Sequence, residues 1–230
     1  MTSVRNQNSA PISMGRFSVA SKWVAAAAAA WLALHSVKPL ATATIQLLNQ
    51  RTTVRWVVCG AIAYLLAARL LRRTRRGQSA INLLMALEHE LAHAFVVLLV
   101  GGRVDQLNAA SNSTGHVLST SRHWLVFIAP YVLPLAMIIP ALLLAVGGHS
   151  HSMVLIFFGM AFAFHVHSSW LETHREQSDL RQVGFVASGI FIVSSHVLTL
   201  LWLCGCLLDT QQPAAAAIRS SVRNALRLII

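Results

Sequence analysis

Three long stretches without a charged residue constrain this chain more than any other feature. The runs His123–Gly147, His149–Leu171 and Val183–Leu208 contain no Asp, Glu, Lys or Arg, and each is at least 23 residues long. About 20 apolar residues can cross the hydrocarbon core of a bilayer as a helix, which satisfies its own backbone where no water is available. Buried helices of a large soluble protein are excluded because only 11% of the 230 residues are charged, too few to cover such runs.

Three further apolar segments precede these runs, so the sequence predicts an all-α, polytopic transmembrane helix bundle of about six spans. The first segment is the shortest, with 15 residues between Lys22 and Lys38. The fourth contains Pro130, Pro134 and Pro140, which predict a kinked or broken helix. The predicted spans are Trp23–Val37, Trp56–Leu71, Ala80–Val100, His123–Gly147, His151–Leu171 and Val183–Leu208.

The segments outside the predicted spans are polar or basic. We expect a polar N-terminal tail over residues 1–22, a membrane-embedded domain over residues 23–210 and a basic amphipathic helix on the lipid bilayer over residues 211–230. The arginines of residues 72–76 indicate a cytoplasmic loop, and alternation of six spans then places Arg103–Ser121 and Glu172–Gln182 together on the other side. The net charge of +11 reflects these membrane flanks, and we expect no nucleic-acid partner.

A His-Glu-x-x-His motif, with His89, Glu90 and His93, lies inside the third predicted span. Residues i and i+4 share one face of a helix, so both imidazoles can bind one zinc ion, while Glu90 lies beside them to take a proton from zinc-bound water. Asn82 extends this polar face, whereas Glu88 points about 100° away and is expected to pair with another helix. Ionisable residues in mid-span are functional by default; the alternative is a buried hydrogen-bond network without metal.

The third metal ligand is not part of this motif. A catalytic zinc site usually has three protein ligands and one open position for water. Asp179 is the predicted third ligand, because Asp105 follows the motif helix too closely and Asp209 lies at the far end of the last span. The polar segment around Asp179 must dip inward to meet His93. The rival ligands are Glu172, Glu176, His174 and His167.

The stretch His89-Glu90-Leu91-Ala92-His93-Ala94, followed by Gly101-Gly102-Arg103-Val104, resembles the site-2 protease family of intramembrane zinc metalloproteases. The resemblance covers about residues 80–185. The family usually has glycine where Ala92 stands, and its Asn-Pro and Leu-Asp-Gly segments are not present as such. Comparable positions are held by Ala129-Pro130-Tyr131 and by Gln177-Ser178-Asp179-Leu180 with Gly184.

The resemblance implies a zinc-dependent endopeptidase, with Glu90 as the catalytic base and His89, His93 and Asp179 as ligands of Zn²⁺. Its substrate would be a membrane protein, cut in or near a membrane-spanning segment, and we expect a multi-pass protein of a bacterial cell membrane. The polar loop Arg103–Ser121 predicts one or two short strands, which are either an edge that holds an extended substrate or an ordinary connection. The alternative function is a non-catalytic metal-binding scaffold or transporter, although a transporter usually carries polar residues in several spans.

Overall fold

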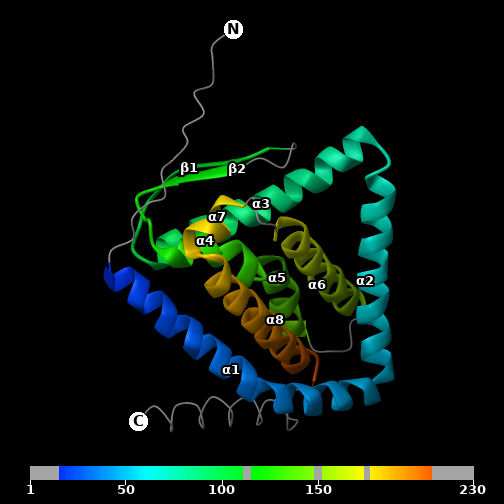
Figure 1. The fold of residues 1–230 in the computed structure, drawn as a ribbon. Helices are drawn as coiled ribbons and strands as arrows, with labels where there is room; N and C mark the ends of the chain where they lie inside the picture. The colour runs from blue at the N-terminus through cyan, green and yellow to red at the C-terminus, as the bar shows by residue number, and fades with distance from the viewer. Residues whose placement is uncertain (1–15, 111–114, 148–151, 174–176, 209–230) are drawn as a thin grey trace.

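The computed structural model describes residues 16–110, 115–147, 152–173 and 177–208 (Figure 1). The predicted surface helix over residues 211–230 lies outside the described residues. The elements, in chain order, are α1 (Arg16–Asn49), α2 (Arg51–Leu71), α3 (Arg75–Leu99), β1 (Val104–Ala109), β2 (Gly115–Ser119), α4 (Trp124–Val132), the 3-10 helix η1 (Leu135–Met137), α5 (Ile138–Gly147), α6 (Ser152–Glu172), α7 (Ser178–Val183) and α8 (Phe185–Leu207).

Within these residues, five helices are long and apolar enough to cross a membrane, namely α1, α2, α3, α6 and α8. A sixth candidate span is the pair α4 and α5, which bends by 53° around η1. Pro134 begins this break and Pro130 lies inside α4, as the prolines predict. The prediction of an all-α bundle with a broken fourth span is therefore confirmed.

The first helix is longer than predicted. We expected a 15-residue span behind a polar tail, but α1 runs from Arg16 to Asn49 and includes both Lys22 and Pro39. Lys22 does not end the helix because its side chain is buried and its ammonium donates a hydrogen bond to the carbonyl of Val183 (2.5 Å). Beyond Pro39, Ala43 packs into a core cluster with α8, and this tertiary contact outweighs the helix-breaking tendency of proline.

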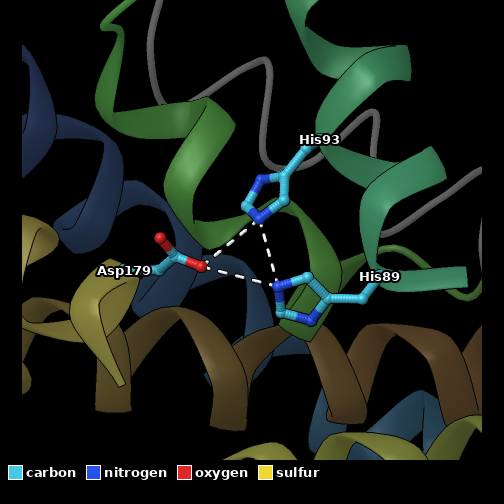
Figure 2. A group of neighbouring side chains, drawn as sticks. All are labelled: His89, His93 and Asp179. Carbon is cyan, nitrogen blue, oxygen red and sulfur yellow. Dashed lines mark hydrogen bonds and ion pairs between the residues drawn. The ribbon is translucent and has the colours of Figure 1, made fainter. Parts of the chain in front are cut away.

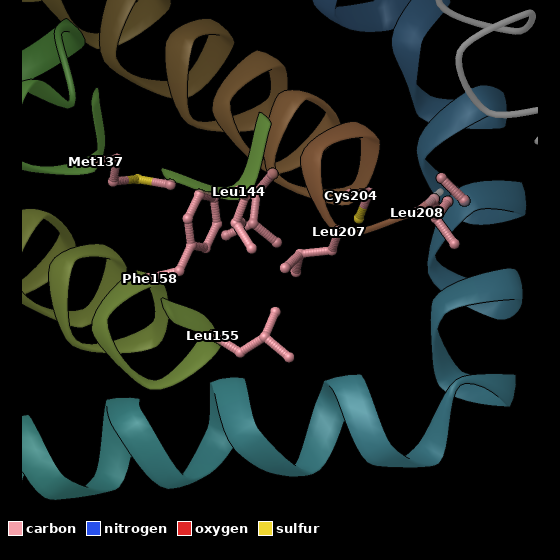
Figure 3. Packing of buried hydrophobic residues seen from close by; sticks show 9 residues of the cluster. Met137, Leu144, Leu155, Phe158, Cys204, Leu207 and Leu208 are labelled. Carbon is pink, nitrogen blue, oxygen red and sulfur yellow. The ribbon is translucent and has the colours of Figure 1, made fainter. Parts of the chain in front are cut away.

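The largest core cluster lies where α1, α5, α6 and α8 meet. Leu144, Leu155, Phe158 and Leu207 point into it from three of these helices and are almost fully buried (Figure 3). A second cluster around Trp124, whose ring stacks on Phe191 at 5.0 Å between centroids, joins α1, α4, α7 and α8. These contacts hold the bundle on which the polar site is built.

Helices α2 and α6 run side by side in the same direction, which contradicts the predicted alternation of six spans. Gly60 faces the backbone of Ile156, and Gly159 faces that of Val57, so the helices touch through their glycines. Further along both helices, the Tyr64 hydroxyl bonds Nδ1 of a histidine on α6 (2.9 Å). Because α3 lies across the end of α2 instead of returning along it, α2 and α6 end on the same side of the bundle (Figure 1).

The motif helix α3 ends at a glycine and leads into a hairpin. Gly101 adopts φ +76°, a conformation that favours glycine, and the amide of Gly102 bonds the carbonyl of Val97 (2.8 Å). Strands β1 and β2 then pair antiparallel, with an irregularity between Val104 and Gln106. The prediction of short strands in Arg103–Ser121 is confirmed. The hairpin folds back beside α3, so that β2 reaches the motif.

Candidate metal centre

The two motif histidines project from one face of α3 toward each other. Four residues separate them, which places one imidazole a helical turn above the other. Their Nε2 atoms lie 3.1 Å apart (Figure 2). The four-residue spacing of the motif therefore brings one nitrogen atom of each imidazole close to the other.

Asp179 reaches the same point from α7, a short helix outside the candidate membrane spans. Its Oδ2 atom lies 3.5 Å from Nε2 of His89 and 3.3 Å from Nε2 of His93 (Figure 2). Ligands of a tetrahedral zinc ion at about 2.0 Å lie about 3.3 Å from one another. The three observed separations match that value, so these atoms fit the corners of one metal site.

The outer nitrogen of each imidazole is occupied by a different partner. Nδ1 of His93 donates to the carbonyl of Val126 (2.7 Å), and Nδ1 of His89 donates to Oε2 of Glu172 (2.6 Å). Each Nε2 then carries a lone pair, and these two lone pairs converge with the carboxylate oxygen of Asp179. Two imidazole nitrogens and one carboxylate oxygen thus converge as the ligands of a metal ion do, and such outer hydrogen bonds are usual for histidines that bind metal.

Contacts from α1 and α8 hold α7 in place. The Lys22 ammonium bonds the last carbonyl of α7, the Ser188 hydroxyl bonds the carbonyl of Leu180 (3.4 Å), and Gly184 turns the chain with φ +92°. Burial alone would raise the pKa of the Asp179 carboxyl, but hydrogen bonds and positive charge from the two imidazoles, when they carry protons, lower that pKa well below the ordinary value. Asp179 is thus a carboxylate at neutral pH, the form that binds metal.

Glu90 is buried beside this cluster, with only 6% of its surface exposed. Gly115, the first residue of β2, lies directly over it, so closely that a Cβ atom on Gly115 would overlap the Glu90 carboxylate. Both residues line a cavity of about 630 Å³, whose wall also includes Asn82, His116 and the three converging side chains. The cavity therefore places one carboxylate next to the candidate metal position and covers it with the hairpin.

A family model described as Peptidase M50B-like matches residues 56–197, which is more than half of the chain and includes the whole site. The chain belongs to the Peptidase M50B-like family. The resemblance to site-2 proteases is thereby confirmed, and membership implies a metallopeptidase built as a multi-pass membrane protein. No match to the chain is found among curated proteins or solved structures.

The rival ligands of this M50B-like protein lie elsewhere or outside the described residues. Glu172 contacts the outer nitrogen of His89 and is therefore not at the converging point. His167 faces Tyr64 on α2. His174 and Glu176 fall outside the described residues. Among the described residues, His89, His93 and Asp179 form the group that could hold a metal ion.

Glu88 belongs to another part of the M50B-like bundle, as its position on α3 predicts. Its Oε1 atom accepts a hydrogen bond from the amide of Ala136 (3.2 Å) in η1, and lies 3.8 Å from Nδ1 of His165 on α6. The His165 ring in turn stacks on His196. Glu88 thus stabilises the broken helix pair by bonding an amide that the break leaves free.

The contacts of two further residues of the site, Tyr131 and Gly115, could not be predicted from the His-Glu-x-x-His motif. Tyr131 is fully buried in α4, and the edge of its ring meets His89 with 5.7 Å between ring centroids. Gly115 contacts Glu90, although 25 residues separate them. Tyr131 stands in the segment quoted for the family resemblance, but neither contact can be read from local spacing.

Proposed function

We propose that this protein is an intramembrane zinc metalloprotease, which hydrolyses a peptide bond in or near the membrane-spanning segment of another membrane protein. The observation that carries the proposal is the convergence of three ligand atoms at tetrahedral spacing beside a buried carboxylate. A non-catalytic scaffold needs the three ligands alone, whereas hydrolysis also needs a base next to the attacking water.

Each residue then has a defined task. Zinc held by His89, His93 and Asp179 would lower the pKa of a bound water toward about 7 and polarise the substrate carbonyl. The Glu90 carboxylate accepts the proton of the attacking water and passes it to the nitrogen of the departing amide. Glu172 and the carbonyl of Val126 keep the two imidazoles aimed at the metal.

The hairpin supports a protein substrate. A membrane helix hides its amide bonds in internal hydrogen bonds, so a substrate must unwind before it can be cut. Residues Gly115, His116 and Val117 of β2 line the cavity, and within the described residues β2 pairs with β1 alone. An unwound segment can add to a strand edge there through backbone hydrogen bonds, which favours the substrate-binding interpretation of this loop over an ordinary connection.

The test combines metal content with proteolysis. Glu90→Gln should keep zinc in the purified protein, because Glu90 is not among the converging ligands, but should slow cleavage by about 10²–10⁴-fold, as expected for loss of a general base. Cleavage is read as new N-terminal peptides of membrane proteins in membranes that contain the native chain or the variant.

Glu88→Gln is the matched control. It makes the same substitution two residues away, and its amide oxygen can still accept the hydrogen bond from Ala136. This control should leave both zinc and cleavage unchanged. Identical N-terminal peptides from the native chain and Glu90→Gln, with zinc present in both, would instead favour the non-catalytic scaffold.

A further inference from the structure

A second hollow, distinct from the metal cavity, lies between the last turns of α2 and His167 of α6. It has a volume of about 510 Å³ and is lined by Leu65, Ala68, Arg69, Arg72, Arg73 and His167. We call it the arginine pocket, because three arginines contribute to its wall. Arg72 also forms part of the wall of the metal cavity.

Among the residues that the structure describes, no carboxylate lines the arginine pocket. Every ion pair found among these residues joins a histidine to a carboxylate, and none includes Arg69, Arg72 or Arg73. Like charges at the end of a membrane helix repel one another more strongly than they do in water, because the surroundings are less polar. An anion bound among them would offset this repulsion.

Arg72 gives the strongest indication that such an anion binds. Its Nε atom is shielded from solvent and has no hydrogen-bond partner among the described residues. Its Nη2 atom donates a hydrogen bond to the sulfur of Met85 (3.7 Å), which is a weak acceptor. A shielded guanidinium donor without a partner is destabilising, and its planar fork matches the oxygen atoms of a phosphate.

Apart from His167, whose Nδ1 atom is bonded to the Tyr64 hydroxyl, the remaining lining is apolar and lies deeper in the membrane. Helix α2 ends as a candidate span at Leu71, so the arginines lie at the level of the lipid headgroups. Leu65 and Ala68 precede Arg69 and Arg72 by one helical turn each, toward the hydrocarbon. The pocket thus combines a cationic rim with an apolar floor.

We propose that the arginine pocket binds a phosphate-bearing anion, namely the headgroup of an anionic phospholipid whose acyl chain lies along Leu65 and Ala68. The orientation of a membrane protein requires positive charge near the cytoplasmic membrane surface but no pocket. Arg75 and Arg76, which lie outside the pocket, already supply such charge, so orientation alone does not explain the pocket. The proposal rests on the pocket and not on the metal, so it can stand or fall independently of the protease activity.

The test compares two variants that each lose two arginines. Lipid binding to the full chain in detergent is measured by native mass spectrometry during titration with phosphatidylglycerol or phosphatidylcholine. The native chain should bind phosphatidylglycerol more tightly. Arg69→Gln with Arg73→Gln should weaken that binding about tenfold, because each arginine near the headgroups contributes to it. Arg75→Gln with Arg76→Gln should change it less than about twofold.

Two further measurements identify the source of the anion. Arg72→Lys keeps the charge and the fold but loses the fork, and should weaken phosphatidylglycerol binding while leaving phosphatidylcholine binding unchanged. Binding of inorganic phosphate without any lipid, if it is lost when Arg69 and Arg73 are replaced, would support an anion site whose ligand is free phosphate. The proposal would be overturned if both double variants lost phosphatidylglycerol binding to the same extent, or if the native chain bound both lipids equally.

Discussion

Nδ1 of His89 lies 2.6 Å from Oε2 of Glu172, a carboxylate 83 residues further along the chain. The contact joins the metal motif on α3 to the last residue of α6, and it fixes which nitrogen of the imidazole faces Asp179. The sequence places Glu172 among the rival metal ligands of Asp179. The structure assigns the two carboxylates to opposite nitrogens of one ring.

Removal of the Glu172 carboxylate should weaken metal binding without abolishing it. Glu172→Ala leaves Nδ1 of His89 without its acceptor, so the ring is no longer held toward the metal, and zinc affinity should fall about 10–100-fold. Glu172→Gln retains an acceptor oxygen, so the zinc affinity of this variant should fall less. Competition with a zinc chelator measures the affinity, and Thr173→Ala, whose hydroxyl bonds Ser169 instead, is the control. Unchanged affinity in Glu172→Ala would contradict this role.

Asp179 should be required for metal and for activity together. Asp179→Ala removes one of three ligand atoms, so zinc content and proteolysis should both be lost, whereas Asp179→Glu should retain part of each. Asp105→Ala is a suitable control because Asp105 is exposed at the irregularity of the hairpin. If Asp179→Ala keeps full zinc and full activity, a rival residue is the third ligand.

Local sequence features predict the motif and the spans, except for the length of the first one. Uncharged runs must be helical in a membrane, the prolines mark the break between α4 and α5, and the four-residue spacing of His89 and His93 requires a shared face. For Asp179 the sequence predicts only that its polar segment dips inward to meet His93, and it does not show how that segment is held there. The short helix α7 resolves this difficulty, since it is held against α1 and α8 by contacts with distant residues.

The direction of the helices could not be predicted by counting spans. Alternation assumes that consecutive helices run antiparallel across the membrane, but α3 lies across the end of α2 (Figure 1). The close contact between α2 and α6 depends on two glycines, Gly60 and Gly159, whose partners are the backbones of distant residues. The arginine-rich end of α2 consequently lies on the same side of the bundle as the end of α6, instead of on the opposite side.

Lys22 should stabilise the helix that carries Asp179. Lys22→Met keeps the apolar part of the side chain but leaves the buried carbonyl of Val183 without its donor. We expect the free energy of unfolding in detergent to fall by about 1–3 kcal/mol, and zinc affinity to fall with it because the end of α7 is released. Lys38→Met, an exposed position on the same helix, should have little effect. Equal thermal stability of the two variants would argue against this role.

Gly115 should be needed for catalysis although it carries no side chain. A Cβ atom at this position would lie 2.6 Å from Cγ of Glu90 and would overlap the carboxylate, so Gly115→Ala must displace either the hairpin or the base. A displacement of about 1 Å at a reacting group can slow a reaction about 10²-fold. We therefore expect proteolysis to fall by about 10–100-fold while zinc content stays unchanged, because the three ligand atoms belong to α3 and α7.

Gly189→Ala is the matched control for this last substitution. Nothing lies within 4 Å of a Cβ atom at Gly189 in α8, and alanine favours a helix over glycine by up to about 1 kcal/mol. This variant should thus keep its activity and its stability. Full proteolysis by Gly115→Ala would mean that the hairpin can move away from Glu90 without consequence, and the strand edge would then have no part in holding the substrate against the base.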